Sequence, residues 1–338
     1  MRLLITTQAV DENAPELGFF TRWIEELAKQ CESVLVVCLF EGAHTLPSNV
    51  RVYSLGKERG DGGKFSYTSK FLRLIREHRD EYDVVFVHQN QEYVLIAGVP
   101  WKLWGKRVYL WRNHYAGSLL TDLAVMLSTR VFCTSRSSYT ATFSKTILMP
   151  VGVDTRAFSS VPDVERSTRA ILSVGRIAPS KNLHILIEAL GKLHKDGIEF
   201  TAAIYGDAAS RDAQYAESLM RLVATRGLEQ CVSFHRGTPN RDTPRIYSRF
   251  GLFVNASRSG MLDKTIFEAA ACGCTVIASS RDFAALAGDA YSFREDNALE
   301  CAGKIALHLG KEAPAILHDI AERNSLTVLA QKLTAAMS

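Results

Sequence analysis

Two basic side chains, Arg176 and Lys181, stand five residues apart where an apolar run at 170–174 meets a predicted helix at 183–195. Glycine follows the apolar run, and Pro-Ser-Lys-Asn precedes the helix. Backbone N–H groups and the helix dipole favour an anion at such a turn. Arginine supplies a fork of donors and lysine a point charge, so the pair can grip one diphosphate. The alternative is an ordinary solvated turn.

A carboxylate with apolar neighbours is the second chemical feature. Glu268 is flanked by Ile266, Phe267, Ala269 and Ala270. A carboxylate in such surroundings needs a partner. It therefore either hydrogen-bonds a ligand hydroxyl or pairs inside the protein.

These residues belong to a chain in which short apolar runs alternate with longer amphipathic segments. In the first half, strands are predicted at 3–7, 34–39, 50–53, 84–88, 108–111, 131–134 and 146–149, and helices at 19–30, 66–79 and 136–143. In the second half, strands are predicted at 170–174, 200–205, 232–235, 252–255 and 275–278, and helices at 183–195, 212–226, 242–249, near 262 and over most of 296–338. This alternation is typical of parallel sheets covered by helices on both faces.

The fold class is therefore α/β, with two Rossmann-like, doubly wound domains that would face a shared cleft. Residues 150–168 hold two prolines and no long apolar run, as expected of a linker. We place the first domain at 1–160 and the second at 161–324. A final helix at about 325–338 is expected to pack back on the first domain.

Length and composition agree with two soluble domains. The 338 residues suit about two domains, and the 47% hydrophobic and 22% charged residues exclude disorder. A net charge of +4 is too small to indicate nucleic-acid binding. The sequence shows no signal peptide and no membrane span, so a cytoplasmic location is expected. The segment after the first strand lacks GxGxxG, and the glycine-rich loop at 56–64 fails the P-loop spacing.

The second half resembles the retaining family-4 glycosyltransferases of the GT-B fold. The matching segments are VGRIAPSKNL, IYGD, VSFHRGT and FVNASRSGMLDKTIFEAAACGCTVIAS, which occur in that order over about 110 residues. The first half is similar in plan, with an opening strand, a glycine loop at 17–20, Asn113-His114 after a strand, and the linker PVGVDTRAF.

The resemblance assigns roles to individual residues. Arg176 and Lys181 match the pair that grips the donor diphosphate and stabilises the departing nucleotide, and His114 matches the histidine near the reacting sugar. The resemblance implies further donor contacts by Gly18, Gly206, Arg236, Gly237, Gly260, Met261, Leu262, Asp263, Lys264 and Glu268, the last to the ribose. Gln8 and His88 are placed on the acceptor side; for His88 an internal hydrogen bond is the alternative.

One position departs from the family pattern. The family carries a glutamate eight residues before the second one, where this chain has Gly260. We expect Asp263 to take over a sugar-hydroxyl contact and Lys264 to add a phosphate contact. No metal or other cofactor is expected, because the nucleotide sugar is a co-substrate and the basic pair carries the charge.

A basic and aromatic stretch in the first half bears on the acceptor. Residues 93–153 hold seven basic residues and one acid. Trp101 and Trp104 lie among Lys102, Lys106 and Arg107, a combination typical of a membrane interface. A glycan or lipid-linked acceptor at a membrane surface would fit; buried tryptophans beside solvated lysines are the alternative. A catalytically inactive nucleotide or carbohydrate binder, a phosphorylase and a dehydrogenase are the competing functions.

Overall fold

The computed structural model describes residues 1–14, 17–60, 62–260 and 262–338. The chain divides into two compact units, one of residues 1–152 with 326–338 and one of residues 153–325. The sequence placed the first boundary at 160. Residues 153–160 belong instead to the second unit, where Val153 bridges Ser325 and the Phe158 ring packs against Tyr247.

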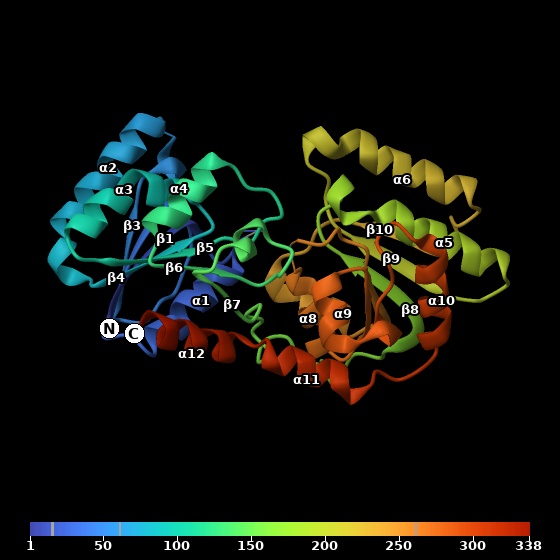
Figure 1. Ribbon diagram of the computed structural model, residues 1–338. Coiled ribbons are helices and arrows are strands. Elements are labelled where there is room, and N and C mark those ends of the chain that lie inside the picture. Colours follow the sequence, from blue (N-terminus) through green and yellow to red (C-terminus); the bar gives the residue numbers. More distant parts are fainter. Residues whose placement is uncertain (15–16, 61, 261) are drawn as a thin grey trace. The chain divides into compact units, whose positions relative to one another are not determined.

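The first unit is built on one parallel sheet in the order β3-β2-β1-β4-β5-β6-β7. Its strands are β1 (Arg2–Val10), β2 (Ser33–Glu41), β3 (Val50–Ser54), β4 (Val84–His88), β5 (Arg107–Trp111), β6 (Arg130–Cys133) and β7 (Thr146–Leu148). Its helices are α1 (Phe19–Ala28), α2 (Lys64–Glu77), α3 (Glu92–Leu103), α4 (Leu119–Leu127) and α12 (Leu326–Met337). Helices α2, α3 and α4 cover one face of the sheet, and α1 and α12 cover the other (Figure 1).

The last helix completes the first unit, as expected. Leu329 and Leu333 of α12 join Trp23 and Ile24 of α1 in one apolar cluster on the sheet. The Trp23 indole also donates to the carbonyl of Gly152, at 3.1 Å. The core of this unit therefore uses residues from both ends of the described chain.

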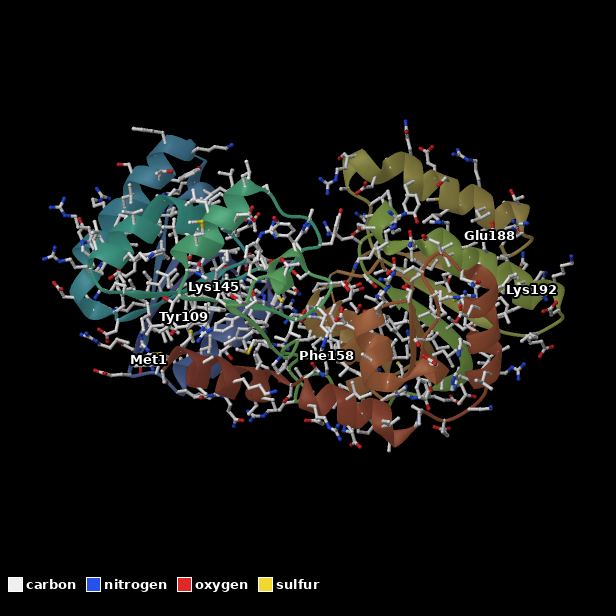
Figure 2. The ribbon with its side chains drawn as sticks, in the orientation of Figure 1. Met1, Tyr109, Lys145, Phe158, Glu188 and Lys192 are labelled. Atoms are coloured by element: carbon white, nitrogen blue, oxygen red, sulfur yellow. The ribbon has the colours of Figure 1, made fainter. Side chains whose placement is uncertain are left out.

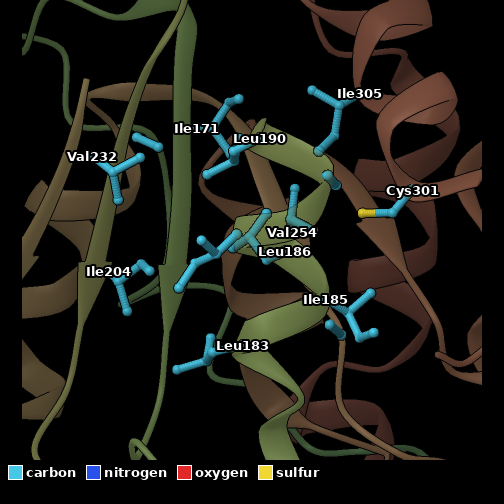
Figure 3. Close-up of a cluster of buried hydrophobic side chains, with 14 of the residues drawn as sticks. Ile171, Leu183, Ile185, Leu186, Leu190, Ile204, Val232, Val254, Cys301 and Ile305 are labelled. Carbon is cyan, nitrogen blue, oxygen red and sulfur yellow. The ribbon is translucent and has the colours of Figure 1, made fainter. Parts of the chain in front are cut away.

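The second unit has a five-stranded parallel sheet in the order β10-β9-β8-β11-β12. Its strands are β8 (Ser167–Val174), β9 (Thr201–Tyr205), β10 (Val232–His235), β11 (Phe250–Asn255) and β12 (Thr275–Ala278). Its helices are α5 (Leu183–Lys195), α6 (Ala213–Thr225), α7 (Thr243–Tyr247), α8 (Lys264–Ala271), α9 (Arg281–Ala287), α10 (Ala298–His308) and α11 (Ala315–Arg323). Side chains of α5, α6 and α10 form the core cluster on one face of the sheet (Figure 3).

The α/β, doubly wound fold predicted from the sequence is confirmed in both units. One predicted helix is wrong: within 136–143 only a short 3-10 turn forms, at Tyr139–Thr142. The hydroxyls of Thr140 and Thr142 donate to backbone carbonyls, of Arg112 and Tyr139, and such local bonds compete with a helix. Among the described residues, no helix is long and apolar enough to cross a bilayer.

Candidate functional site

A pocket lies at the carboxyl ends of three neighbouring strands in the second unit. Its lining comes from β8, β9 and β11 and from the turn that follows β8; it comprises Ser173, Val174, Gly175, Arg176, Lys181, Leu183, Ile204, Tyr205, Asn255, Ala256 and Ser257. Strand β8 has β9 on one side and β11 on the other, so the strand order reverses there. Ligands of doubly wound sheets bind at such a switch point.

Two glycines let the backbone come together at this pocket. A Cβ on Gly206 would lie 1.9 Å from the carbonyl oxygen of Gly175, so no side chain fits there. Gly175 has a φ of +150°, a backbone conformation that residues with a side chain rarely adopt. The turn after β8 continues as a 3-10 turn at Pro179–Lys181, and α5 begins at Leu183. The predicted strand, turn and helix start are therefore all present.

The structure brings the two predicted basic residues, Arg176 and Lys181, to one pocket. Arg176 is exposed, whereas Lys181 is partly buried. The ammonium group of Lys181 lies 2.7 Å from Oδ2 of Asp263. The pocket thus has two cations at the edge of a sheet, and one of them is already held by a carboxylate.

Asp263 is the centre of a polar network. Its Oδ2 accepts hydrogen bonds from Lys181, from Asn255 Nδ2 at 2.9 Å and from Ser257 Oγ at 2.6 Å. Burial alone would raise the pKa of this carboxyl, but the charge of Lys181 and the three bonds outweigh it, so the pKa is lowered. Asp263 is therefore an ionised partner of Lys181. Asn255 and Ser257 were not predicted as site residues, although Asn255 ends an apolar strand and Ser257 lies two residues after it.

Glu268, on α8, is buried and has partners inside the protein. Its side chain accepts from the Tyr247 hydroxyl at 3.1 Å and from Asn240 Nδ2 at 3.3 Å. Burial raises the pKa of Tyr247, as does the neighbouring Glu268 charge. The sequence left two alternatives for Glu268, a hydrogen bond to a ligand hydroxyl or a partner inside the protein. The structure has the internal partners.

Lys264 starts the same helix, one turn before Glu268. Burial lowers the pKa of Lys264 to about 7, against a smaller opposing effect of the Glu268 charge. The loop before α8 reaches the helix through Gly260, which has φ +107, and Leu262, whose side chain is buried. Met261 lies outside the described residues.

The predicted base-reading residues follow β10. Arg236 extends into solvent with its Nε 3.5 Å from Oδ1 of Asp207, and the backbone N–H of Gly237 donates to Oδ2 of Asp207 at 3.1 Å. Nearby, the rings of Tyr205 and His235 stack with centroids 4.4 Å apart. This exposed stack, which the sequence analysis did not anticipate, adds flat surface at the ends of β9 and β10.

In the first unit, the predicted residues lie at different depths. Gln8 is exposed near the end of β1, and Gly18 directly precedes α1. A Cβ on Gly18 would lie 2.7 Å from the Ala14 carbonyl oxygen, which explains the glycine without a ligand. His114 is in the loop between β5 and α4, where Ala116 N–H donates to its Nδ1 at 3.0 Å.

His88 is not at the surface. Its side chain is 1% exposed, its ring stacks on Phe20 with centroids 3.7 Å apart, and its Nδ1 lies 3.2 Å from Thr7 Oγ1. The expectation that His88 lines an acceptor surface is therefore wrong, because aromatic packing covers it; the internal hydrogen bond is the alternative that holds.

The tryptophan part of the predicted basic patch is also corrected. Trp101 is fully buried and donates to the Tyr82 hydroxyl at 3.1 Å, and Trp104 is partly buried. Lys106 donates to the Tyr82 carbonyl and Arg107 to the Ser338 carbonyl, so both basic side chains have internal partners. Lys102 is exposed.

Residues 168–309 match the family model described as "Glycosyl transferases group 1". A GDP-mannose-dependent alpha-(1-6)-phosphatidylinositol monomannoside mannosyltransferase of Mycolicibacterium smegmatis is 28% identical over 163 residues, 43% of this chain and 41% of the relative. Mannosylfructose-phosphate synthase of Agrobacterium fabrum is 28% identical over 142 residues, 38% of this chain and 31% of that protein. The chain thus matches less than half of the length of either curated relative.

Solved structures resemble the chain over its whole length. HepE of Anabaena, solved in complex with UDP, has a TM-score of 0.78 at 19% identity and covers 99% of both chains. The lipopolysaccharide outer core galactosyltransferase WaaB, solved without ligand, has a TM-score of 0.69 at 14% identity, with 99% of both chains covered. At such identities the likeness shows the fold. The chain therefore has the GT-B fold, and residues 168–309 of its second unit match the model of the glycosyl transferases group 1 family.

Proposed function

We propose that this protein is a glycosyltransferase that moves a sugar from a nucleotide diphosphate sugar to a hydroxyl of a glycan or lipid-linked acceptor. The observation that carries the proposal is the convergence of Arg176 and Lys181 on one pocket at the strand ends of the family domain. Two fixed cations at a switch point suit a diphosphate better than a neutral ligand.

In the proposed reaction, the bond between the anomeric carbon and the donor phosphate breaks while a bond to the acceptor oxygen forms. The acceptor proton moves to the departing phosphate oxygen, and the anomeric configuration is retained. Arg176 and Lys181 stabilise the charge that develops on the diphosphate, in the role that a metal ion has in other transferases. The protein contributes mainly position and electrostatics.

Within the network, we propose that Asp263 positions Lys181. A contact between Asp263 and a sugar hydroxyl was expected from the sequence, but Oδ2 of Asp263 already accepts three hydrogen bonds from protein groups. An ammonium group has three N–H donors, so Lys181 can keep its bond to Asp263 and still donate to a phosphate. Lys264, one residue later, remains a candidate for a second phosphate contact, and Glu268 for a ribose contact. The first-unit residues His114, Gly18 and Gln8 keep their proposed roles beside the sugar and acceptor.

A thermal-shift experiment tests the proposal. UDP, GDP, ADP and their sugars are each added to the purified protein; the panel includes both UDP and GDP because the mycobacterial relative is GDP-mannose-dependent and HepE was solved with UDP. A ligand at about 100 times its Kd stabilises the native state by about 2.7 kcal/mol. We expect one nucleotide family to raise the Tm, and Arg176→Ala to abolish the shift.

Arg211→Ala is the matched control. Arg211 lies in the same unit, its side chain is 78% exposed, and it does not line the pocket. Its removal should leave the shift unchanged. A shift that survives Arg176→Ala, or that is lost equally in Arg211→Ala, would contradict the proposed donor site.

The second candidate is a nucleotide binder without catalysis, which Gly260 favours because it stands where the pattern of the family that the sequence resembles has a glutamate. This function predicts the same thermal shift with no release of nucleotide from the donor in the presence of acceptor glycans. Release of nucleotide that is lost in Lys181→Ala would exclude it.

A further inference from the structure

Helices α3 and α4 of the first unit carry a row of large apolar side chains that face solvent. The row, which we call the α3–α4 face, consists of Val99, Leu103, Leu119, Leu120, Leu123 and Met126. Leu103, Leu119 and Met126 are 81%, 85% and 67% exposed. On α4 the positions 119, 123 and 126 recur at spacings of four and three, so their side chains share one side of the helix.

The fold does not need these side chains. Helix α4 packs inward through Thr121, Ala124 and Val125, which are buried. An ordinary surface helix is polar on its outer side, whereas α4 is apolar there as well. Its one acidic residue, Asp122, accepts a hydrogen bond from the Tyr139 hydroxyl at 2.8 Å. Exposed apolar side chains that gather on two neighbouring helices mark an interaction surface.

Basic side chains gather at the C-terminal end of α4. The Lys145 ammonium donates to the carbonyls of Val125 and Ser128 at 2.9 and 2.8 Å, which holds it at the helix end (Figure 2). Burial lowers the pKa of Lys145, and so do the neighbouring charges of Lys102 and Arg130. Lys102 directly precedes Leu103 of the α3–α4 face, and Arg130 lies three residues after the end of α4, so both cations flank the apolar row along the chain. Lys102 and Arg130 are exposed.

We propose that the α3–α4 face docks on an anionic lipid bilayer. Leucine and methionine side chains would enter the boundary between headgroups and acyl chains, and Lys102 and Arg130 would contact lipid phosphates. The positive charge beside this face favours an anionic bilayer over a second copy of the chain as the partner. A symmetric pair would bring the same cations of both copies to one interface, whereas an anionic bilayer supplies the opposite charge.

The position of this face suits a lipid-linked acceptor. The α4 part of this face begins at Leu119, the first residue of α4, and His114 lies five residues earlier in the segment that joins β5 to α4. Docking there would leave the loop that holds His114 next to the lipid surface. The docking inference itself does not depend on the proposed transfer reaction.

Vesicle co-sedimentation tests the inference with the full chain. We expect the protein to bind mixed phosphatidylcholine–phosphatidylglycerol vesicles and to bind pure phosphatidylcholine vesicles much more weakly. The double variant Leu123→Gln with Met126→Gln should lower the partition coefficient by about tenfold or more, since two inserted apolar side chains are lost. Lys102→Glu with Arg130→Glu should lower it on the anionic vesicles by a similar factor.

The matched control is Leu299→Gln with Leu307→Gln, two leucines exposed on α10 of the second unit. It should bind like the unaltered protein. No binding of the unaltered protein to anionic vesicles, or equal loss in the control, would overturn the inference. A dimer in analytical ultracentrifugation that the Leu123 and Met126 variant dissociates would overturn it in favour of self-association. The nucleotide thermal shift should persist in every variant, so its loss would count against the donor site and not against docking.

Discussion

The two units share one plan and differ in what stands at the point where the strand order reverses. In the first unit β1 lies between β2 and β4, and in the second β8 lies between β9 and β11. In both, the first strand leads through a loop to a helix that packs on the sheet. The same topology therefore creates the same opening twice.

The contents of the two openings are opposite in character. In the first unit the His88 ring, at the end of β4, is covered by Phe20 and Trp23 of α1. In the second unit the switch point holds Arg176 and Lys181, in the turn after β8, beside a pocket. Topology thus provides the same place twice, and side chains decide whether it is filled by aromatic rings or left as a pocket lined by cations.

The largest expected effect comes from emptying the aromatic cluster around His88 in the first unit. Phe20→Ala should cost about 3–5 kcal/mol of the free energy of unfolding, because it removes a fully buried ring that stacks on His88. Denaturant unfolding measures this loss. Phe65→Ala is the control, since that ring is 89% exposed and should contribute under about 0.5 kcal/mol. Equal costs for the two variants would mean that the aromatic cluster is not a core.

The next largest effect concerns the pocket of the second unit. Lys181→Ala should lower kcat/KM for nucleotide release from the donor by about 10²–10³-fold, because it removes one of two cations that face the developing charge. Lys181→Arg should restore part of that loss. Lys192→Ala, on the outer side of α5 where Lys192 pairs with Asp196, should change nothing (Figure 2). If Lys192→Ala is as slow as Lys181→Ala, the pocket is not the donor site.

Asp263→Asn sharpens the comparison further, because it removes the charge that holds Lys181. The folded-state pKa of Asp263 is lowered, so its stabilisation is present above its unfolded pKa of about 4 and is lost as the pH falls below it. The variant should be less stable by about 1–3 kcal/mol at pH 7 and close to the unaltered protein at acid pH. Thermal melts across pH measure this. Asp196→Asn, which removes an exposed carboxylate of the same unit outside the network around Asp263, is the matched control.

The smallest effect comes from Lys264. Its folded pKa of about 7 is below its ordinary value, so the charged form is disfavoured in the folded protein. That cost is complete below pH 7 and disappears as the pH rises from 7 toward 10.5. Lys264→Met should therefore stabilise the protein at pH 6 and have little effect on its stability at pH 10. A gain that is independent of pH would show that packing, and not charge, is responsible.

The elements that the sequence predicted best are those with clear periodicity and clear ends. The strand Val84–His88 and the helix Leu183–Lys195 have the bounds that were expected. Helix α3 was missed because it is apolar on all sides and contains Pro100, so it shows no 3.6-residue pattern. Helix α4 was missed for the same reason, because it has no polar side and therefore no clear 3.6-residue pattern.

At the site, the spacing of Arg176 and Lys181 after a strand was sufficient to predict their convergence, since a strand, a turn and a helix start have little geometric freedom. The partners of Asp263 and Glu268 were not predictable in this way. Tyr247 and Asn240 reach Glu268 from a segment more than twenty residues away, and such contacts depend on how helices pack. Burial of His88 has the same origin, because it depends on the aromatic residues of α1.

The return of α12 to the first unit has a consequence for how the protein is made. Residues 326–338 belong to the first unit but follow all of residues 153–325 in the chain. Domains generally fold in the order in which they leave the ribosome. Here the first unit lacks Leu329 and Leu333 until the second unit has been synthesised in full. The half that is translated first is therefore the half that is finished last, and during that interval the apolar side of α1 lacks the cover that α12 provides.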